Sequence, residues 1–395
     1  MLNLISIQLL FWFGWQFATY QNVYFQSIGM TAAEIGIMSA ASSVVSVLAS
    51  FAWGYIADRM NSIKKAFMLD LLISAVTIAV IPLLPTNFKY MSVMFIFYKS
   101  ISCIGQGPLG TLIDNHAVRN CEEFGLNYGT ITAFRCIAGT VGGILCTFVL
   151  GKIDLKYAFY IFGAMMIPTF ICIFVSNDPV VVQKEKNADL TKGAGGMGIL
   201  LGNYYFITFI VFAALFNIAH QPVTNFISFF MEDIGVATEN FGIYNSVRVL
   251  TSIPFMFMFG WIRKRMKLRT ILVCSCVCMG AESLFLGLFA RSLVGLLLCG
   301  AIYGLGCGLF LGVVSLYIIK LAPEGLQATA HNIYGAVTVG AGILGNLVGG
   351  KLYEMTGGAT FYAVIGIVMI VSVLFFAASL VFGRAHGIVN KADES

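Results

Sequence analysis

Long apolar segments of helix length, separated by short polar loops, dominate this sequence. In one of them, TENFGIYNSVRVLTSIPFMFMFGWI at 238–262, Arg248 lies near the middle. Runs of about 20 apolar residues match the thickness of a bilayer core, and they lack the alternation that marks an outer-membrane β-barrel. Because 59% of the residues are hydrophobic and only 10% are charged, we expect an all-α membrane protein.

The apolar segments predict about twelve transmembrane helices. They lie at 3–26, 31–56, 64–84, 90–117, 126–150, 157–176, 201–230, 239–262, 270–289, 293–319, 327–350 and 358–383. The polar insert SNDPVVVQKEKNADLTKGAGG at 176–196 follows the sixth helix and has the composition of a linker. We therefore expect an N-terminal six-helix half at 1–176, a cytoplasmic linker at 177–200 and a C-terminal six-helix half at 201–395.

The distribution of Lys and Arg predicts the orientation in the membrane. If both termini are cytoplasmic, that face collects most basic loop residues, including the cluster from Arg263 to Arg269. The other face has only Lys89, Lys152, Lys156, Arg291 and Lys351. Since cytoplasmic loops carry an excess of Lys and Arg, the net charge of +5 reflects topology, and we expect a lipid bilayer rather than nucleic acid as the partner.

No constellation typical of an enzyme is present. The sequence has no P-loop and no catalytic or metal-ligand spacing, so we expect neither catalysis nor a bound metal or cofactor. Nine of the ten cysteines lie inside the predicted spans, and only Cys121 falls in a predicted loop. We interpret them as small apolar packing residues.

The two halves resemble each other at one cytoplasmic loop. GYIADRMNSIKK at 54–65 follows the second predicted helix, and GWIRKRMKLRT at 260–270 follows the eighth. Gly54, Asp58 and Arg59 match the G-x-x-x-D-R loop motif, and the chain therefore resembles the major facilitator superfamily. The resemblance implies two six-helix halves that rock by alternating access, with these three residues in a cytoplasmic gating latch. It also implies a monomer in the cell inner membrane.

Within that superfamily, FQSIGMTAAEIGIMSA at 25–40 and ATAHNIYGAVTVGAGILGNLVGG at 328–350 resemble the branch of oligosaccharide:proton symporters, which contains lactose permease, and of nucleoside symporters. The chain departs from it at several positions. Thr111 replaces an acid that binds galactosides, the Arg expected at Thr132 appears at Arg135, and Gly306 replaces the proton-carrying Glu. Galactoside specificity is therefore not carried over.

Three ionisable residues lie near the middle of predicted spans: Arg135, Arg248 and Glu282. Such residues are expensive in lipid and must face protein or water. Glu282 is the best candidate to carry a coupling proton, because a dry environment favours the neutral acid and a neighbouring Arg favours the carboxylate. Arg248 either binds substrate, sets the charge of Glu282 or forms a structural pair with it. Arg135 has no obvious midplane carboxylate, since Asp114, a second candidate for proton coupling, and Asp70 are placed nearer the cytoplasmic side.

Polar stripes at helical spacing predict the wall of a substrate cavity. Because amides, hydroxyls and aromatic rings suit sugars or nucleosides, we take the substrate-binding candidates from these stripes and from the two Arg residues. The candidates are Gln16, Tyr20, Tyr24, Lys99, Gln106, Arg135, Asn217, Gln221, Thr224, Asn245 and Arg248. Interhelical hydrogen bonding is the alternative role for each of them.

The leading hypothesis is a secondary transporter that imports a small polar solute, namely a sugar, oligosaccharide or nucleoside, with protons as the coupling ion. The second is an organic-anion transporter, which requires that Arg135 and Arg248 are not both neutralised within the protein. A drug exporter ranks lower, because the fifth span lacks the antiporter motif. A solute sensor that does not transport also remains open.

Overall fold

The computed structural model describes residues 2–87, 89–126, 128–178, 198–323 and 325–386. Within these residues the chain is helical and forms twelve successive spans. In the first half they are α1 (Leu2–Ala18) with α2 (Gln21–Ser27), α3 (Ala32–Arg59), α4 (Ile63–Val80) with η1 (Ile81–Leu83), α5 (Met91–Phe124), α6 (Tyr128–Leu150) and α7 (Tyr157–Val175). In the second half they are α9 (Tyr204–Asn225) with α10 (Ile227–Asp233), η2 (Thr238–Asn240) with α11 (Phe241–Arg263), α12 (Leu268–Phe289), α13 (Leu293–Leu321), α14 (Gln327–Thr356) and α15 (Gly358–Ala385).

The prediction of an all-α membrane protein is confirmed. Nine of the described helices are long and apolar enough to cross a membrane by themselves. The other three spans are α1 with α2, α5 and α11. The first is divided into two short helices, and the other two carry charged residues at Lys99, Asp114 and Arg248.

Several helix ends differ from the prediction. The first span is interrupted at Thr19 and Tyr20, and the seventh is interrupted at Phe226, one turn beyond Pro222. Helix α5 continues to Phe124, past its predicted end at 117, so that Cys121 lies buried in a helix rather than in a loop. The charged residues near this end made the last two turns look like a loop in the sequence.

Short polar residues set where several helices begin. Thr31 accepts a hydrogen bond from the Glu34 amide while the Glu34 carboxylate accepts one from the Thr31 amide, a capping box at the start of α3. Ser62, Asn203 and Ser292 cap α4, α9 and α13 in the same way through their side-chain oxygens. These caps satisfy backbone amides that the first turn of a helix leaves without partners.

The chain divides into two compact units. The first comprises Met1–Val182 with Val236–Ser246, and the second comprises Gln183–Gly235 with Val247–Ser395. The predicted linker at 177–200 lies largely at 179–197, outside the described residues. Residues 236–246, which the sequence places in the second half, join the first unit, where Tyr20 donates to the Glu239 carbonyl at 2.7 Å and accepts from the Gly242 amide at 2.8 Å.

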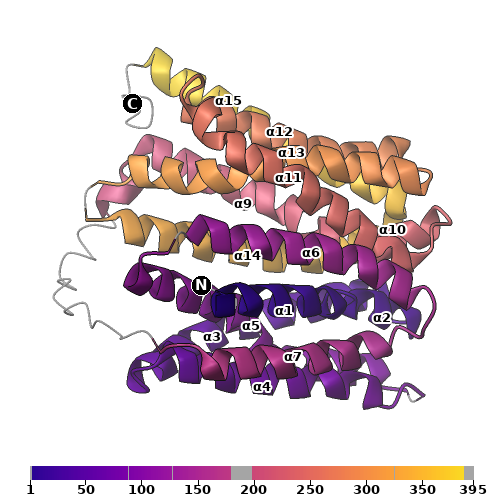
Figure 1. Cartoon of the computed structure of the whole chain (residues 1–395). Coiled ribbons are helices and arrows are strands. Elements are labelled where there is room, and N and C mark those ends of the chain that lie inside the picture. The colour runs from indigo at the N-terminus through magenta and orange to yellow at the C-terminus, as the bar shows by residue number, and fades with distance from the viewer. Residues whose placement is uncertain (1, 88, 127, 179–197, 324, 387–395) are drawn as a thin grey trace. The chain divides into compact units, whose positions relative to one another are not determined.

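The same helix pairs pack together inside each unit. In the first unit α1 packs against α6 and α7, and α4 packs against α5 and α7 (Figure 1). In the second unit α9 packs against α14 and α15, and α12 packs against α13 and α15. Each unit therefore joins its first span to its fifth and sixth, and its third span to its fourth and sixth, as a duplicated six-helix unit requires.

Helix α5 contains Pro108, which has no amide hydrogen to offer the carbonyl of Ile104 one turn earlier. The indole nitrogen of Trp53 in α3 donates to that carbonyl instead, at 2.8 Å. The polar group that the proline leaves free is thus satisfied by a neighbouring helix. This bond ties α3 to the middle of α5, at the point where α5 is weakest.

Glycines allow two close helix contacts in the second unit. Gly304, Gly308 and Gly312 recur at steps of four on α13 and face Thr251, Ser252 and Phe259 of α11. On α14, Gly345 lies against the Ile218 carbonyl and Gly349 lies against Pro222, both on α9. Small residues let membrane helices approach closely, and these faces fix the positions of α9 and α11 against their neighbours.

The close contact of α14 with α9 predicts an effect of Gly345→Ala. A Cβ at this position would meet the main chain of α9 at Ile218, which cannot rotate away, so we expect a loss of about 1–3 kcal/mol. Gly340→Ala on the same helix is the matched control, since no atom lies near its Cβ and alanine favours a helix. Thermal unfolding in detergent measures both, and equal stability of the two variants would contradict the contact.

Candidate functional site

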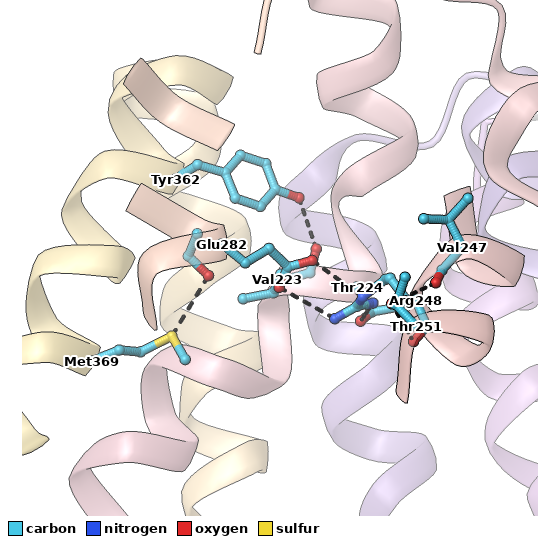
Figure 2. Close-up of polar contacts among 9 residues, drawn as sticks. Val223, Thr224, Val247, Arg248, Thr251, Glu282, Tyr362 and Met369 are labelled. Atoms are coloured by element: carbon cyan, nitrogen blue, oxygen red, sulfur yellow. Dashed lines mark hydrogen bonds and ion pairs between the residues drawn. The ribbon is translucent and has the colours of Figure 1, made fainter. Parts of the chain in front are cut away.

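A buried ion pair joins α11 to α12 in the second unit. Arg248 Nε lies 3.1 Å from Glu282 Oε1, and the two side chains are 5% and 0% exposed. Arg248 Nη2 also donates to Glu282 Oε2 at 3.4 Å, and Nη1 donates to the Thr224 hydroxyl of α9 at 3.0 Å (Figure 2). The two charges neutralise each other where water does not reach them, and the guanidinium connects three helices.

An aromatic ring supports the same guanidinium. The Arg248 Cζ atom lies 3.6 Å from the centre of the Tyr303 ring on α13, which is a cation–π contact. On α9, the His220 ring stacks on Tyr303 with centroids 5.8 Å apart, and Phe216 stacks on His220. Because Gly304 lets α13 approach the main chain of Arg248, ring and guanidinium can meet face to face.

The Arg248–Glu282 pair has further polar neighbours on α9 and α15. Tyr362 of α15 donates its hydroxyl to the Val223 carbonyl of α9 at 2.7 Å, beside Glu282 in Figure 2. This bond holds the turn of α9 that follows Pro222. The pair therefore lies among α9, α11, α12, α13 and α15, with each helix contributing a side chain or a carbonyl.

Four of the predicted polar residues lie on α9 and α11, the helices that carry Thr224 and Arg248. Gln221 and Thr224 are exposed, although both lie in a helix long and apolar enough to span a membrane. Polar groups at this depth are costly against lipid and therefore line water or face protein. Asn217 and Asn245 are half-buried, and the Asn217 amide donates to the Ala213 carbonyl on its own helix. Of the predicted polar residues here, Thr224 is thus the one joined to Arg248.

A second ion pair lies in the first unit and differs in exposure. Arg135 Nη1 of α6 lies 3.0 Å from Asp114 Oδ2 of α5, and the side chains are 35% and 36% exposed. The Arg135 Cζ atom lies 3.8 Å from the centre of a Trp12 ring of α1. Both units therefore contain a guanidinium that is paired with a carboxylate and covered by an aromatic ring, but only the pair in the first unit is open to solvent.

The expectation that Arg135 has no midplane carboxylate was wrong. Asp114 was expected near the cytoplasmic end of a helix that stops at 117, but α5 continues for ten residues beyond Asp114. Arg135 lies seven residues after the start of α6. On antiparallel neighbours these positions come to about the same depth, so the two side chains meet.

A third polar group in the first unit centres on Gln106 of α5. Lys99 donates to the Gln106 amide oxygen, Gln106 donates to the Ser102 hydroxyl at 2.9 Å, and Gln21 of α2 donates to Gln106 at 3.4 Å. Lys99 and Gln106, both predicted to bind substrate, are thus in direct contact. The partner of Lys99 is a neutral amide, in contrast to the carboxylates that face the two Arg residues.

The remaining candidates of the first span serve packing in this structure. Gln16 is buried against the glycine face of α6. The Tyr20 hydroxyl bonds to the main chain at 239–242, and the Tyr24 ring packs edge-on against Phe159. A role for these three residues in substrate binding stays a prediction.

The predicted latch lies at the C-terminal end of α3. Gly54, Asp58 and Arg59 are exposed, and the chain turns into α4 through Asn61, which adopts a positive φ of 49°. Beyond this turn, Lys64 donates to the carbonyls of Phe174 and Ser176 at the end of α7, both at 2.7 Å. The gating role of the three latch residues stays a prediction.

Trp12 and Tyr303 are the two residues at these ion pairs that the predicted site omits. Each lies on a different helix from the Arg it covers, so no spacing in the sequence relates them. For Trp12 the signal is the i, i+4 stripe that it forms with Gln16, Tyr20 and Tyr24. For Tyr303 the signal is only general, because an Arg inside a membrane span favours an aromatic face beside it. Among the described residues, no group of His, Cys, Asp and Glu that could hold a metal was found.

Comparisons with known proteins show the family and the fold of the chain. The model of the MFS_1 like family matches residues 2–364. Uncharacterized transporter YwbF of Bacillus subtilis (strain 168) is 23% identical over 86% of this chain and 83% of that protein. Xanthosine permease of Escherichia coli (strain K12) is 22% identical over 95% and 93%. A crystal structure of the nucleoside transporter NupG superposes with a TM-score of 0.82 at 19% identity, over 96% of this chain and 99% of that one, which shows the fold.

The buried pair predicts a large asymmetry between single and double variants. Glu282→Leu leaves Arg248 buried, charged and without its carboxylate, so we expect a loss of about 3–5 kcal/mol. Adding Arg248→Met removes the stranded charge and should restore most of that stability. Asp154→Asn is the control, because Asp154 pairs with Lys156 at an exposed site and should change little. Chemical unfolding in detergent measures all three, and additive losses in the double variant would contradict the pairing.

Proposed function

The chain belongs to the MFS_1 like family of the major facilitator superfamily, and from this we propose that it is a secondary active transporter that imports a nucleoside. The observation that carries the proposal is the Arg248–Glu282 pair, closed to water and bonded through Arg248 to Thr224, an exposed polar residue of α9. A group that takes up a proton and a surface that binds a polar solute are thus connected by one hydrogen bond.

The relatives support nucleosides among the polar solutes considered. Xanthosine permease and the nucleoside transporter NupG are both similar to this chain along most of its length. A nucleoside offers hydroxyls and a flat base, which suit the amide of Gln221, the hydroxyl of Thr224 and aromatic faces. A sugar or an oligosaccharide shares the hydroxyls and lacks the base.

The charge balance favours a neutral substrate over an organic anion. Each Arg that could attract an anion already has a carboxylate at hydrogen-bond distance, Arg135 with Asp114 and Arg248 with Glu282. One observation favours the second function: Lys99 contacts the amide oxygen of Gln106, which leaves its charge uncompensated at that contact. An anion-binding protein would place its substrate there.

Proton symport follows from how Glu282 would respond to its neighbours. While Arg248 lies against it, the carboxylate is stabilised. If substrate draws Arg248 or Thr224 away, Glu282 stays in a dry environment that favours the protonated acid. Binding of substrate and of a proton would therefore support each other, and alternating access would carry both across the membrane. Asp114, paired with Arg135 and open to solvent, is the corresponding candidate in the first unit.

The remaining expectations are part of the same proposal. We propose that the protein works as a monomer in the cell inner membrane, with both termini cytoplasmic. The coupling ion is a proton, and the substrate and the surrounding lipid are the only partners that the function needs.

Ligand-induced stabilisation tests the substrate class. A ligand that binds only the folded protein raises the unfolding temperature by mass action. We expect neutral nucleosides to do so for the purified protein, and we expect Gln221→Ala to weaken the effect. Sugars, sugar acids and aromatic acids are the comparison set. Stabilisation by anions alone would overturn the nucleoside proposal in favour of the second function.

Proton coupling is tested by Glu282→Gln, which mimics the protonated acid permanently. In proteoliposomes we expect loss of uphill accumulation driven by a proton gradient, because no proton can leave residue 282. Exchange of labelled for unlabelled substrate across equal gradients should continue and shows that the variant is folded. Full accumulation by Glu282→Gln would remove Glu282 from the coupling role.

A further inference from the structure

A second carboxyl group is sealed inside the first unit. Asp70 of α4 is 0% exposed, and among the described residues neither of its oxygens has a hydrogen-bond partner. Ser74, one turn further along α4, is also 0% exposed, and its hydroxyl oxygen likewise has no such partner. Asp70 lies seven residues after the start of α4, about 10 Å along the helix axis.

Among the described residues, no ionisable group on the helices packed against α4 is shown in contact with Asp70. On α5, His116 faces Phe67 and bonds to Ser176, and Asp114 pairs with Arg135. The other ionisable groups of these helices are Tyr98, Lys99, Cys103, Arg119, Cys121, Glu122 and Glu123 on α5, Glu34, Tyr55, Asp58 and Arg59 on α3, Tyr157, Tyr160 and Cys172 on α7, and Lys64 and Lys65 on α4 itself. No hydrogen bond or ion pair found in the described part of the chain joins any of them to Asp70.

An ionised carboxylate in this position would be unstable. Removing a charge from water costs several kcal/mol unless a counter-charge and hydrogen bonds replace the water, and the described part of the chain provides neither at Asp70. A protonated carboxyl group avoids that cost. We propose that Asp70 is a proton-binding site of the first unit, separate from Glu282, which holds its proton in this conformation and releases it when α4 and α5 part.

The packing beside Asp70 is suited to such an opening. Helices α4 and α5 run antiparallel, since Tyr98 donates to the Thr77 carbonyl and Ser74 lies against Gly105. One turn from Ser74, Asp70 therefore comes level with the turn of α5 that contains Pro108. That turn lacks one helical hydrogen bond and is held by Trp53 instead. A bend of α5 at Pro108 would admit water to Asp70.

The release step rests on the proposed transport cycle, whereas protonation of Asp70 does not. Asp70 would thus be a second proton site of the first unit beside the candidate Asp114, and it differs from Glu282 of the second unit in how it releases its proton. Glu282 would lose its proton when the Arg248 guanidinium pairs with it. Asp70 would lose its proton when water reaches it. The two sites would respond to different helix movements, those of α11 and of α5.

Infrared spectroscopy of the purified protein tests protonation without any substrate. At neutral pH we expect a carbonyl stretching band of a protonated carboxylic acid that is lost in Asp70→Asn and retained in Glu282→Gln. If Asp70→Asn does not fold, Asp70→Glu should keep an acid and shift the band. Identical bands in the wild type and in the folded Asp70 variant would overturn the proposal.

Proton counting in proteoliposomes tests release. We expect fewer protons to enter per nucleoside in Asp70→Asn than in the wild type, measured with a pH-sensitive dye and labelled substrate. An unchanged ratio would overturn release from Asp70. If the wild type moves no proton with any nucleoside, the proposed function fails, and the infrared band still decides whether Asp70 is a proton site.

Discussion

A guanidinium cannot give up its charge, and the second unit is arranged around that constraint. Arg248 is nearly inaccessible to water, so the protein must supply what water would. Glu282 supplies the counter-charge, Thr224 accepts a hydrogen bond, and Tyr303 covers the flat face of the cation. The small glycine surface of α13 is a condition for this arrangement, because a larger residue at Gly304 would hold α11 away from Tyr303.

The first unit meets the same constraint in other ways. Arg135 keeps its carboxylate partner but remains partly in water. Lys99 is in contact with an amide, and Asp70 avoids the cost of burial by carrying a proton, as we propose. Ionisable groups inside a membrane protein are expensive. Each of these groups is therefore a candidate for a task that an apolar residue could not perform.

The sequence predicted the number and order of the spans, because bilayer thickness fixes helix length and the loops are short. A pair between Arg248 and Glu282 was one of the alternatives that the sequence left open, because both residues lie near the middle of their spans, and the structure contains it. The predicted depth of Asp114 in the membrane was wrong. Charged residues follow Asp114 in the sequence, so the end of α5 was predicted too early. The aromatic covers at Trp12 and Tyr303 could not be predicted, because they depend on how neighbouring helices are rotated.

Helix interruptions were also only partly predictable. Pro222 marks a weak point in α9, but the break occurs at Phe226, because the last turn is held by a bond from the Phe226 amide to the Pro222 carbonyl. In α5, Pro108 causes no break at all, because Trp53 takes over the missing bond. A proline shows where a backbone carbonyl is released, and tertiary structure decides whether the helix ends there.

Because the two ion pairs differ in exposure, a change in ionic strength should affect one of them and not the other. Dissolved salt screens charges that water surrounds, over a distance of about 8 Å at physiological concentration. It can therefore weaken Arg135–Asp114 between α5 and α6, but it cannot enter between Arg248 and Glu282. Of these two ion pairs, only the one in the first unit should therefore weaken as the salt concentration rises.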